Sequence, residues 1–121
     1  MELHFVHRNA QGEPAVVGVF LQEGAANPLI QRIWDAVEGE AHALNAPAGS
    51  FDPEDLLPAN REFYRYAGSL TTPPCTEGVR WHVLHTPIEV SAAQVDEFRA
   101  LFPLNARPIQ PLNECAVLTS H

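Results

Sequence analysis

Residues 68–81 read GSLTTPPCTEGVRW, and this stretch decides how the rest of the chain is interpreted. Thr71 and Thr72 stand directly before Pro73 and Pro74. Because proline fixes φ and has no backbone N–H, the pair ends a strand and holds the following turn rigid. Two hydroxyl groups held at the end of a strand can position a small polar ligand. The alternative is an ordinary turn whose threonine side chains cap the local backbone, and the residue types alone favour that alternative.

The segments on either side have the pattern of β-strands. Residues 63–69 precede the threonines, and residues 79–85 follow them. Residues 3–8 are a third predicted strand, and residues 15–21 (AVVGVFL) are a continuous apolar run of strand length. A run without polar positions is typical of a strand that is covered on both faces, and we expect it to have neighbours on both sides.

Two helices complete the regular structure that we expect. Asn27 followed by Pro28 is an N-cap with proline at the first helical position, which predicts a helix over residues 28–37. Ser91 and Gln94 predict a capping box for a second helix that ends at Leu101. The inner face of this second helix should carry Val95, Phe98 and Phe102. The pattern as a whole is an α+β fold, mainly β.

Length and composition indicate a single domain of 121 residues and 13.3 kDa, with 45% hydrophobic and 18% charged residues. We expect residues 45–61 to be a loop with one short helical turn, and residues 105–112 to be an edge or irregular segment. The net charge is −8, which argues against binding to nucleic acid or to an anionic membrane surface. All seven basic residues are arginine, so lysine Schiff-base chemistry is excluded. The chain starts Met-Glu-Leu-His, so we expect no signal peptide, and no apolar run has the length of a membrane span.

The first strand carries the residues with the strongest metal-site pattern. Glu2 and His4 are two apart and share a face of the strand, whereas His7 points to the other face. A carboxylate beside a histidine is the arrangement that orients a metal ligand. Catalytic zinc needs three protein ligands, however, so one histidine is not a site. The remaining histidines do not form an evident set with it: His42, His82, His85 and His121.

Taken together, these segments resemble the α-class carbonic anhydrases. Residues 2–7 resemble the strand that carries the third zinc-binding histidine of that family, and residues 15–21 resemble the next strand. Residues 68–81 are similar to the most specific family signature, and residues 105–113 to its closing segment. The resemblance covers residues 2–113 of one partial domain, while the tail, residues 114–121, diverges. It implies part of the central mixed, twisted sheet of that family, with short flanking helices.

The resemblance also implies roles for individual residues in the zinc-dependent, reversible hydration of CO2 to bicarbonate. His4 is the zinc-ligand position, and Glu2 is the carboxylate that orients it. Thr71 is the gatekeeper whose hydroxyl accepts a hydrogen bond from zinc-bound hydroxide, and Thr72 lines the polar side of the pocket. The Pro73–Pro74 bond is expected to be cis. The apolar wall where CO2 docks is formed by Val16, Leu70, Val79 and Trp81.

The other two zinc ligands of the family form a His-x-His on an earlier strand, which would lie before Met1. We therefore expect a C-terminal half-domain that has weak or no activity by itself. The alternative is a catalytically silent fragment that acts as a binding or oligomerisation module. A third possibility is that several copies share a metal through His4. An open strand edge and an uncovered apolar wall predict a homo-oligomer or a complex with the missing half.

Cysteine usage leaves two questions open. Cys75 and Cys115 allow at most one disulfide and do not form a C-x-x-C motif, so their pairing is undecided. Family members with a cysteine at the position of Cys75 are commonly exported and bond it to the N-terminal half. This resemblance indicates a periplasmic or secreted parent protein, while the compartment of this chain stays open.

Overall fold

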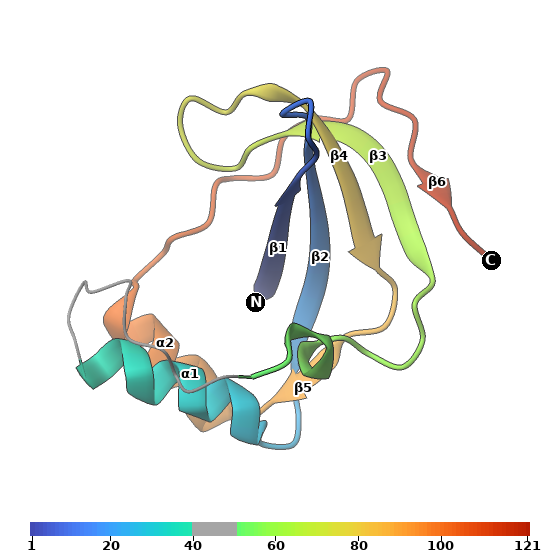
Figure 1. The fold of residues 1–121 in the computed structure, drawn as a ribbon. Coiled ribbons are helices and arrows are strands. Elements are labelled where there is room, and N and C mark those ends of the chain that lie inside the picture. The colour runs from blue at the N-terminus through green and yellow to red at the C-terminus, as the bar shows by residue number, and fades with distance from the viewer. Residues whose placement is uncertain (40–50) are drawn as a thin grey trace.

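The computed structural model describes residues 1–39 and 51–121 and contains a six-stranded mixed sheet (Figure 1). The strand order is β1-β2-β4-β3-β6, and β5 extends the pairing of β2. Pairing is antiparallel between β1 and β2, β3 and β4, and β3 and β6, whereas β2 pairs in parallel with β4 and β5. The strands are β1 Glu2–Arg8, β2 Pro14–Glu23, β3 Phe63–Ser69, β4 Glu77–Leu84, β5 Ile88–Val90 and β6 Leu118–Thr119.

A short turn returns β1 onto β2 and sets their register. The side chain of Asn9 accepts hydrogen bonds from the backbone N–H groups of Gln11 and Glu13, and Gly12 has a φ of +84°. Asn is favoured at such turns because its side chain accepts hydrogen bonds from the following backbone, and Gly because it tolerates a positive φ. The register that follows places His4 directly opposite Gly18.

The apolar run occupies the centre of the sheet. As predicted, β2 has neighbours on both sides, β1 and β4. Its buried residues are Val16, Gly18, Val19 and Leu21. The expectation of cover on both faces is wrong at Phe20, which is 43% exposed. Phe20 lies opposite Glu2 on the outer strand pair, on the face of the sheet away from the helices.

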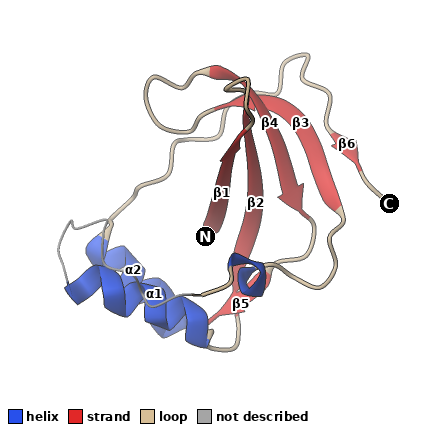
Figure 2. Cartoon of the chain, in the orientation of Figure 1, coloured by secondary structure: helices blue, strands red, loops and turns tan. Residues whose placement is uncertain are grey.

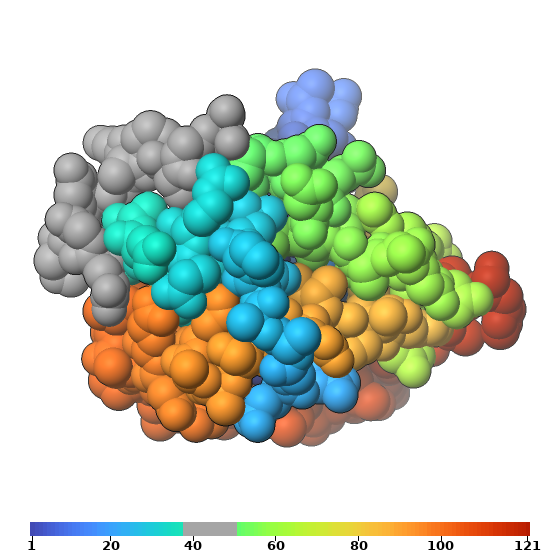
Figure 3. Space-filling model, turned by 90° about the horizontal axis from the view of Figure 1, so that it is seen from below, coloured from blue at the N-terminus to red at the C-terminus, as the bar shows by residue number. Residues whose placement is uncertain are grey.

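Two helices pack together near the end of β2 (Figures 2 and 3). They are α1, Pro28–Gly39, and α2, Ala92–Leu101, and a 3-10 turn, η1 Pro53–Leu56, lies close by. The side chain of Asn27 accepts hydrogen bonds from the first turn of α1, and Ser91 and Gln94 form the predicted capping box of α2. The core between the helices and the sheet is formed by Leu21, Ile30, Trp34, Leu56 and Val90.

Gln94 also joins the two helices, a role that its cap pattern did not predict. It is 4% exposed, and its side-chain amide donates to the backbone oxygen of Asn27 at 2.8 Å and accepts from the Asn27 N–H at 3.0 Å. The indole N–H of Trp34 donates to the backbone oxygen of Gln94 at 3.0 Å. Of the three residues predicted for the inner face of α2, Val95 and Phe98 pack against the core. Phe102 is 39% exposed and contacts Phe98, because α2 has ended at Leu101.

The fold class was predicted correctly, since the chain has a mixed, mainly β architecture with two short helices. The predicted strand over residues 63–69 coincides with β3, and residues 105–112 have no regular structure, as expected. Two short strands, β5 and β6, were not predicted. The prediction for residues 45–50 and the position of His42 lie outside the described residues.

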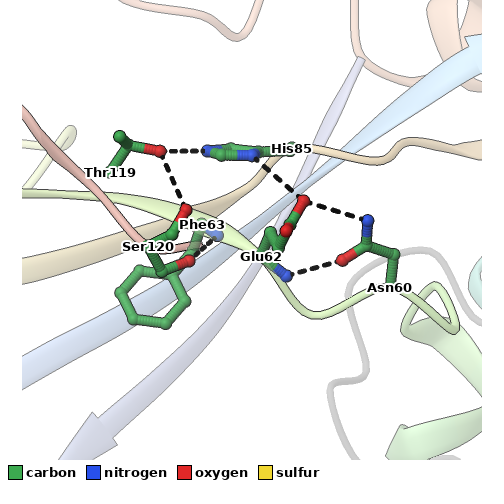
Figure 4. Close-up of polar contacts among 6 residues, drawn as sticks. All are labelled: Asn60, Glu62, Phe63, His85, Thr119 and Ser120. Carbon is green, nitrogen blue, oxygen red and sulfur yellow. Dashed lines mark hydrogen bonds and ion pairs between the residues drawn. The ribbon is translucent and has the colours of Figure 1, made fainter.

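The tail folds back as β6 along the outer side of β3 (Figure 1), and Figure 4 shows the polar contacts made there. Ser120 accepts a hydrogen bond from the Phe63 N–H at 2.7 Å, and its own N–H donates to the Phe63 oxygen. The imidazole of His85 lies between the Thr119 hydroxyl, at 3.1 Å, and the Glu62 carboxylate, at 4.0 Å. These contacts hold the end of the chain against the sheet.

Candidate functional site

The face of the sheet away from the helices gathers most of the predicted site residues. Cross-strand pairing aligns His4 with Gly18 on one side of β2 and Val16 with Trp81 on the other. Residues directly opposite each other point to the same face, so His4 and Trp81 stand on one surface. The apolar cluster of this face consists of Val16, Val79, Trp81 and Val83, with Leu70 and Tyr66 packed against it.

The apolar wall is more enclosed than its sequence indicated. We expected it to be uncovered, but Val16 is 1% exposed, Val79 is 0% exposed and Trp81 is 4% exposed. The reason is local, because Leu70 and the ring of Tyr66 pack against the cluster. The Tyr66 ring stacks on Trp81 at a centroid separation of 6.1 Å and an interplanar angle of 3°.

His4 lies between a carboxylate and an aromatic ring. The Glu2 Oε1 atom is 3.3 Å from His4 Nε2, at an angle that does not form a well-aligned hydrogen bond. Nε2 is buried, whereas the side chains of His4 and Glu2 as a whole are 30% and 35% exposed. The imidazole meets Trp81 edge to face, with centroids 4.9 Å apart at 77°. Because the Glu2 carboxylate lies next to Nε2, Nδ1 is the ring nitrogen that remains for a metal ion.

Trp81 and Tyr66 form a stacked, uncharged aromatic pair on this surface. The Trp81 indole N–H donates to the Ser69 backbone oxygen at 3.0 Å, which satisfies the one polar atom of a buried ring. Burial raises the pKa of the Tyr66 phenol, and the Glu2 carboxylate and the Cys115 thiol raise it further, against an opposing effect of Arg107. The phenol is therefore protonated and uncharged at neutral pH.

The threonine turn follows β3 directly. Thr71 and Thr72 are exposed, and the Pro73–Pro74 bond is cis, as predicted. Backbone bonds close the turn: the Leu70 N–H donates to the Thr76 oxygen at 2.9 Å, and the Cys75 N–H donates to the Thr72 oxygen at 2.8 Å. Neither threonine hydroxyl hydrogen-bonds to a described residue, so both are available to a ligand.

The described residues do not hold a zinc ion by themselves. Within residues 1–39 and 51–121, no three His, Cys, Asp or Glu side chains converge on one point. His7 is exposed on the other face of β1, where Nδ1 bonds to the Phe5 oxygen. His82 contacts Phe63, and His85 belongs to the tail contacts, so neither joins His4. Among the described residues, His4 therefore has no second and third histidine, cysteine or carboxylate beside it that would complete a three-ligand group.

Both cysteines are free thiols in the structure, and each is half-buried. The Cys115 thiol donates to the Ala67 backbone oxygen at 3.2 Å, and this contact holds the tail beside β3. Two open hollows of about 250 Å³ and 350 Å³ lie away from His4. The first is lined by residues such as His7, Glu13 and Arg80, and the second by Ala67, Gly68, Ser69, Glu77 and Gly78.

The whole chain, residues 1–121, matches the family model described as eukaryotic-type carbonic anhydrase. The chain belongs to the α-class carbonic anhydrases. It is 50% identical over 119 residues to a carbonic anhydrase of Nostoc sp., covering 98% of this chain and 45% of that protein. It is 45% identical to a carbonic anhydrase of Neisseria gonorrhoeae, covering 98% of this chain and 47% of that protein.

Solved structures agree with the family. The α-carbonic anhydrase from Thermovibrio ammonificans, solved with the inhibitor sulfanilamide, superimposes with a TM-score of 0.89 and 46% identity, covering 96% of this chain and 52% of that chain. Dioscorin complexed with ascorbate superimposes with a TM-score of 0.84 and 33% identity, covering 98% of this chain and 52% of that one. The chain thus spans about half the length of the proteins that it matches. Among the described residues, no helix has the length and apolar character needed to cross a membrane.

Proposed function

We propose that this chain supplies the CO2-binding half of an α-carbonic anhydrase active site, which hydrates CO2 reversibly to bicarbonate when the site is complete. One observation carries the proposal. The Glu2–His4 pair stands on the same surface as the buried apolar cluster around Trp81, with His4 and Trp81 in direct contact. A metal-ligand position beside an apolar wall is what a nonpolar substrate that reacts with an activated water requires.

Each group has a proposed role in that site. His4 is a zinc ligand through Nδ1, and Glu2 holds the ring from the Nε2 side. Thr71 orients the attacking oxygen, and Thr72 contributes polarity to the rim. The wall of Val16, Leu70, Val79 and Trp81 is the apolar surface for CO2, with half-buried Leu70 as its accessible member and the other three packed behind it. Zinc, when bound, acts as a Lewis acid that makes a water reactive near neutral pH.

We propose that the remaining ligands come from a segment that meets the β1 edge. Met1 and Leu21 exchange both backbone hydrogen bonds, at 2.9 and 3.1 Å. Because hydrogen-bonded pairs alternate along an antiparallel ladder, the backbone groups of Glu2, His4, Val6 and Arg8 point away from β2. We propose that the rest of the domain pairs with this edge and brings the other ligands, with a second copy of the chain as the other candidate. Nothing in the geometry favours the catalytically silent alternative.

Complementation tests this proposal. The chain is mixed with the segment of the Thermovibrio ammonificans enzyme that it does not cover, and zinc content and CO2 hydration are measured. We expect little zinc on the chain alone, because one ligand does not form a catalytic site, and about one zinc per complex after mixing. His4→Ala should abolish zinc binding and activity, whereas His7→Ala, on the other face of β1, is the matched control. Equal zinc binding by the His4→Ala variant would overturn the proposal.

A further inference from the structure

A carboxylate occupies the space where residue 18 would carry a side chain. A Cβ atom built at Gly18 would lie 2.6 Å from Glu2 Oε1 and 3.3 Å from Val83 Cγ2. The first distance is far below van der Waals contact. Gly18 lies within β2 and is buried, and its φ is not in the left-handed region, so its backbone geometry does not require glycine. The reason for a glycine at this position is therefore space.

The sheet register shows what the space is for. Gly18 lies directly opposite His4, and Glu2 lies opposite Phe20. Glu2 must therefore lean along the strand toward position 18 for its carboxylate to come within 3.3 Å of His4 Nε2. Cβ atoms of directly opposed residues are about 4.5–5.5 Å apart, so a side chain at position 18 would stand beside the imidazole, where the carboxylate now is.

We propose that Gly18 is a positioning residue, whose missing side chain creates the slot that holds the Glu2 carboxylate against His4. Glycine weakens the interior of a strand, so local preference does not explain its presence here. A side chain at position 18 would meet both Glu2 and Val83. Glu2 is the one that can move, because its side chain is 35% exposed whereas Val83 is buried at 7% exposure. A methyl group at position 18 would displace the carboxylate into solvent and leave Nε2 buried without a nearby acceptor.

The effect on catalysis rests on the proposed function, but the contact can be tested without zinc or a partner. The probe is the Nε2–H proton of His4 in the 121-residue chain, followed by ¹⁵N-edited NMR with all variants compared at one pH. In the unaltered chain, we expect a protected Nε2–H signal. Gly18→Ala should accelerate its exchange about twofold to fivefold, the effect of losing a partly exposed electrostatic contact. Glu2→Ala should do the same.

A double-mutant comparison separates this role from general disturbance of the sheet. If Gly18 acts through Glu2, adding Gly18→Ala to Glu2→Ala should cause no further change. Gly24→Ala is the matched control, because its Cβ would lie 2.6 Å from the Glu89 carboxyl carbon, at a site remote from His4. Gly24→Ala should leave the His4 signal unchanged.

Two results would overturn the proposal. One is a Gly18→Ala chain whose His4 proton exchanges as in the unaltered chain while Glu2→Ala accelerates it. The other is equal acceleration by Gly24→Ala. If Gly18→Ala does not fold, Gly18→Ala with Val83→Ala removes the 3.3 Å contact and retains the clash with Glu2, so the same loss is expected. Failure of complementation with zinc would not alter these results, so the two proposals fail separately.

Discussion

Replacement of Trp81 is the most direct test of whether the apolar wall is a packed unit. Trp81 is 4% exposed, contacts His4 and Tyr66, and donates its indole N–H to the Ser69 oxygen at 3.0 Å. Trp81→Ala should lower the free energy of unfolding by about 3–5 kcal/mol, the cost of removing a buried large aromatic side chain. Trp81→Phe keeps a ring in place but leaves the Ser69 oxygen without its donor, which costs about 1–3 kcal/mol.

Urea unfolding measures both values, because Trp34 remains as a fluorescent reporter. Trp34 is 9% exposed and packs on Phe98 at a centroid separation of 5.0 Å, so its emission should change when the core opens. Tyr64→Phe is the matched control, because this ring is 46% exposed, and surface changes of this kind usually cost less than about 0.5 kcal/mol. Equal costs for Trp81→Phe and Trp81→Ala, or a Trp81→Ala cost below about 1 kcal/mol, would refute the view that the ring supports the site by packing.

Three further predictions concern other parts of the chain. Burial, and then Arg65 and Arg80, lower the pKa of His82 in the folded chain, so as pH falls the unfolded chain is protonated at His82 before the folded chain is. The free energy of unfolding should therefore decrease as pH falls below about 6.5, and His82→Gln should reduce that decrease in urea titrations. The exposed β1 edge should pair antiparallel with β1 of a second copy, with Glu2 facing Arg8 of that copy. Sedimentation should therefore show a dimer, which Val6→Lys should weaken because Val6 is exposed on that strand. An unaltered chain that stays monomeric at micromolar concentration would contradict this. Ser91→Ala should cost about 1 kcal/mol through loss of the α2 cap, as measured by thermal unfolding, and no change in the midpoint would count against it.

Local patterns were enough to predict the long elements. The apolar run of residues 15–21 indicated a central strand, and it lies between β1 and β4. The capping pattern of Ser91 and Gln94 predicted the start of α2 correctly. The strand β5, Ile88–Val90, is too short to show a periodicity of its own, and it forms because it meets the end of β2. Likewise, β6 depends on Ser120 binding to Phe63, a contact that spans 57 positions.

In the site, too, local sequence patterns predicted some features, whereas others depend on contacts between strands. Alternation along one strand was enough to place Glu2 and His4 on a common face, and the structure brings them to 3.3 Å. The space at Gly18 depends on the register between β1 and β2, which the chain sets through the turn at Asn9 and Gly12. No pattern within a single strand contains that information. The enclosure of Trp81 by Tyr66 is likewise a cross-strand contact, between β3 and β4.

Under the proposed function, the position of His4 on an edge strand would link metal affinity to assembly. If other ligands join His4 only when a partner strand pairs with β1, then zinc binds the assembled state and not the separate chains. By mass action, zinc at 100 times its dissociation constant would stabilise that assembly by about 2.7 kcal/mol. The apparent zinc affinity would then increase with protein concentration, and a chelator would act as a dissociating agent. In such an arrangement, the concentration of free zinc determines how much of the protein exists as an enzyme.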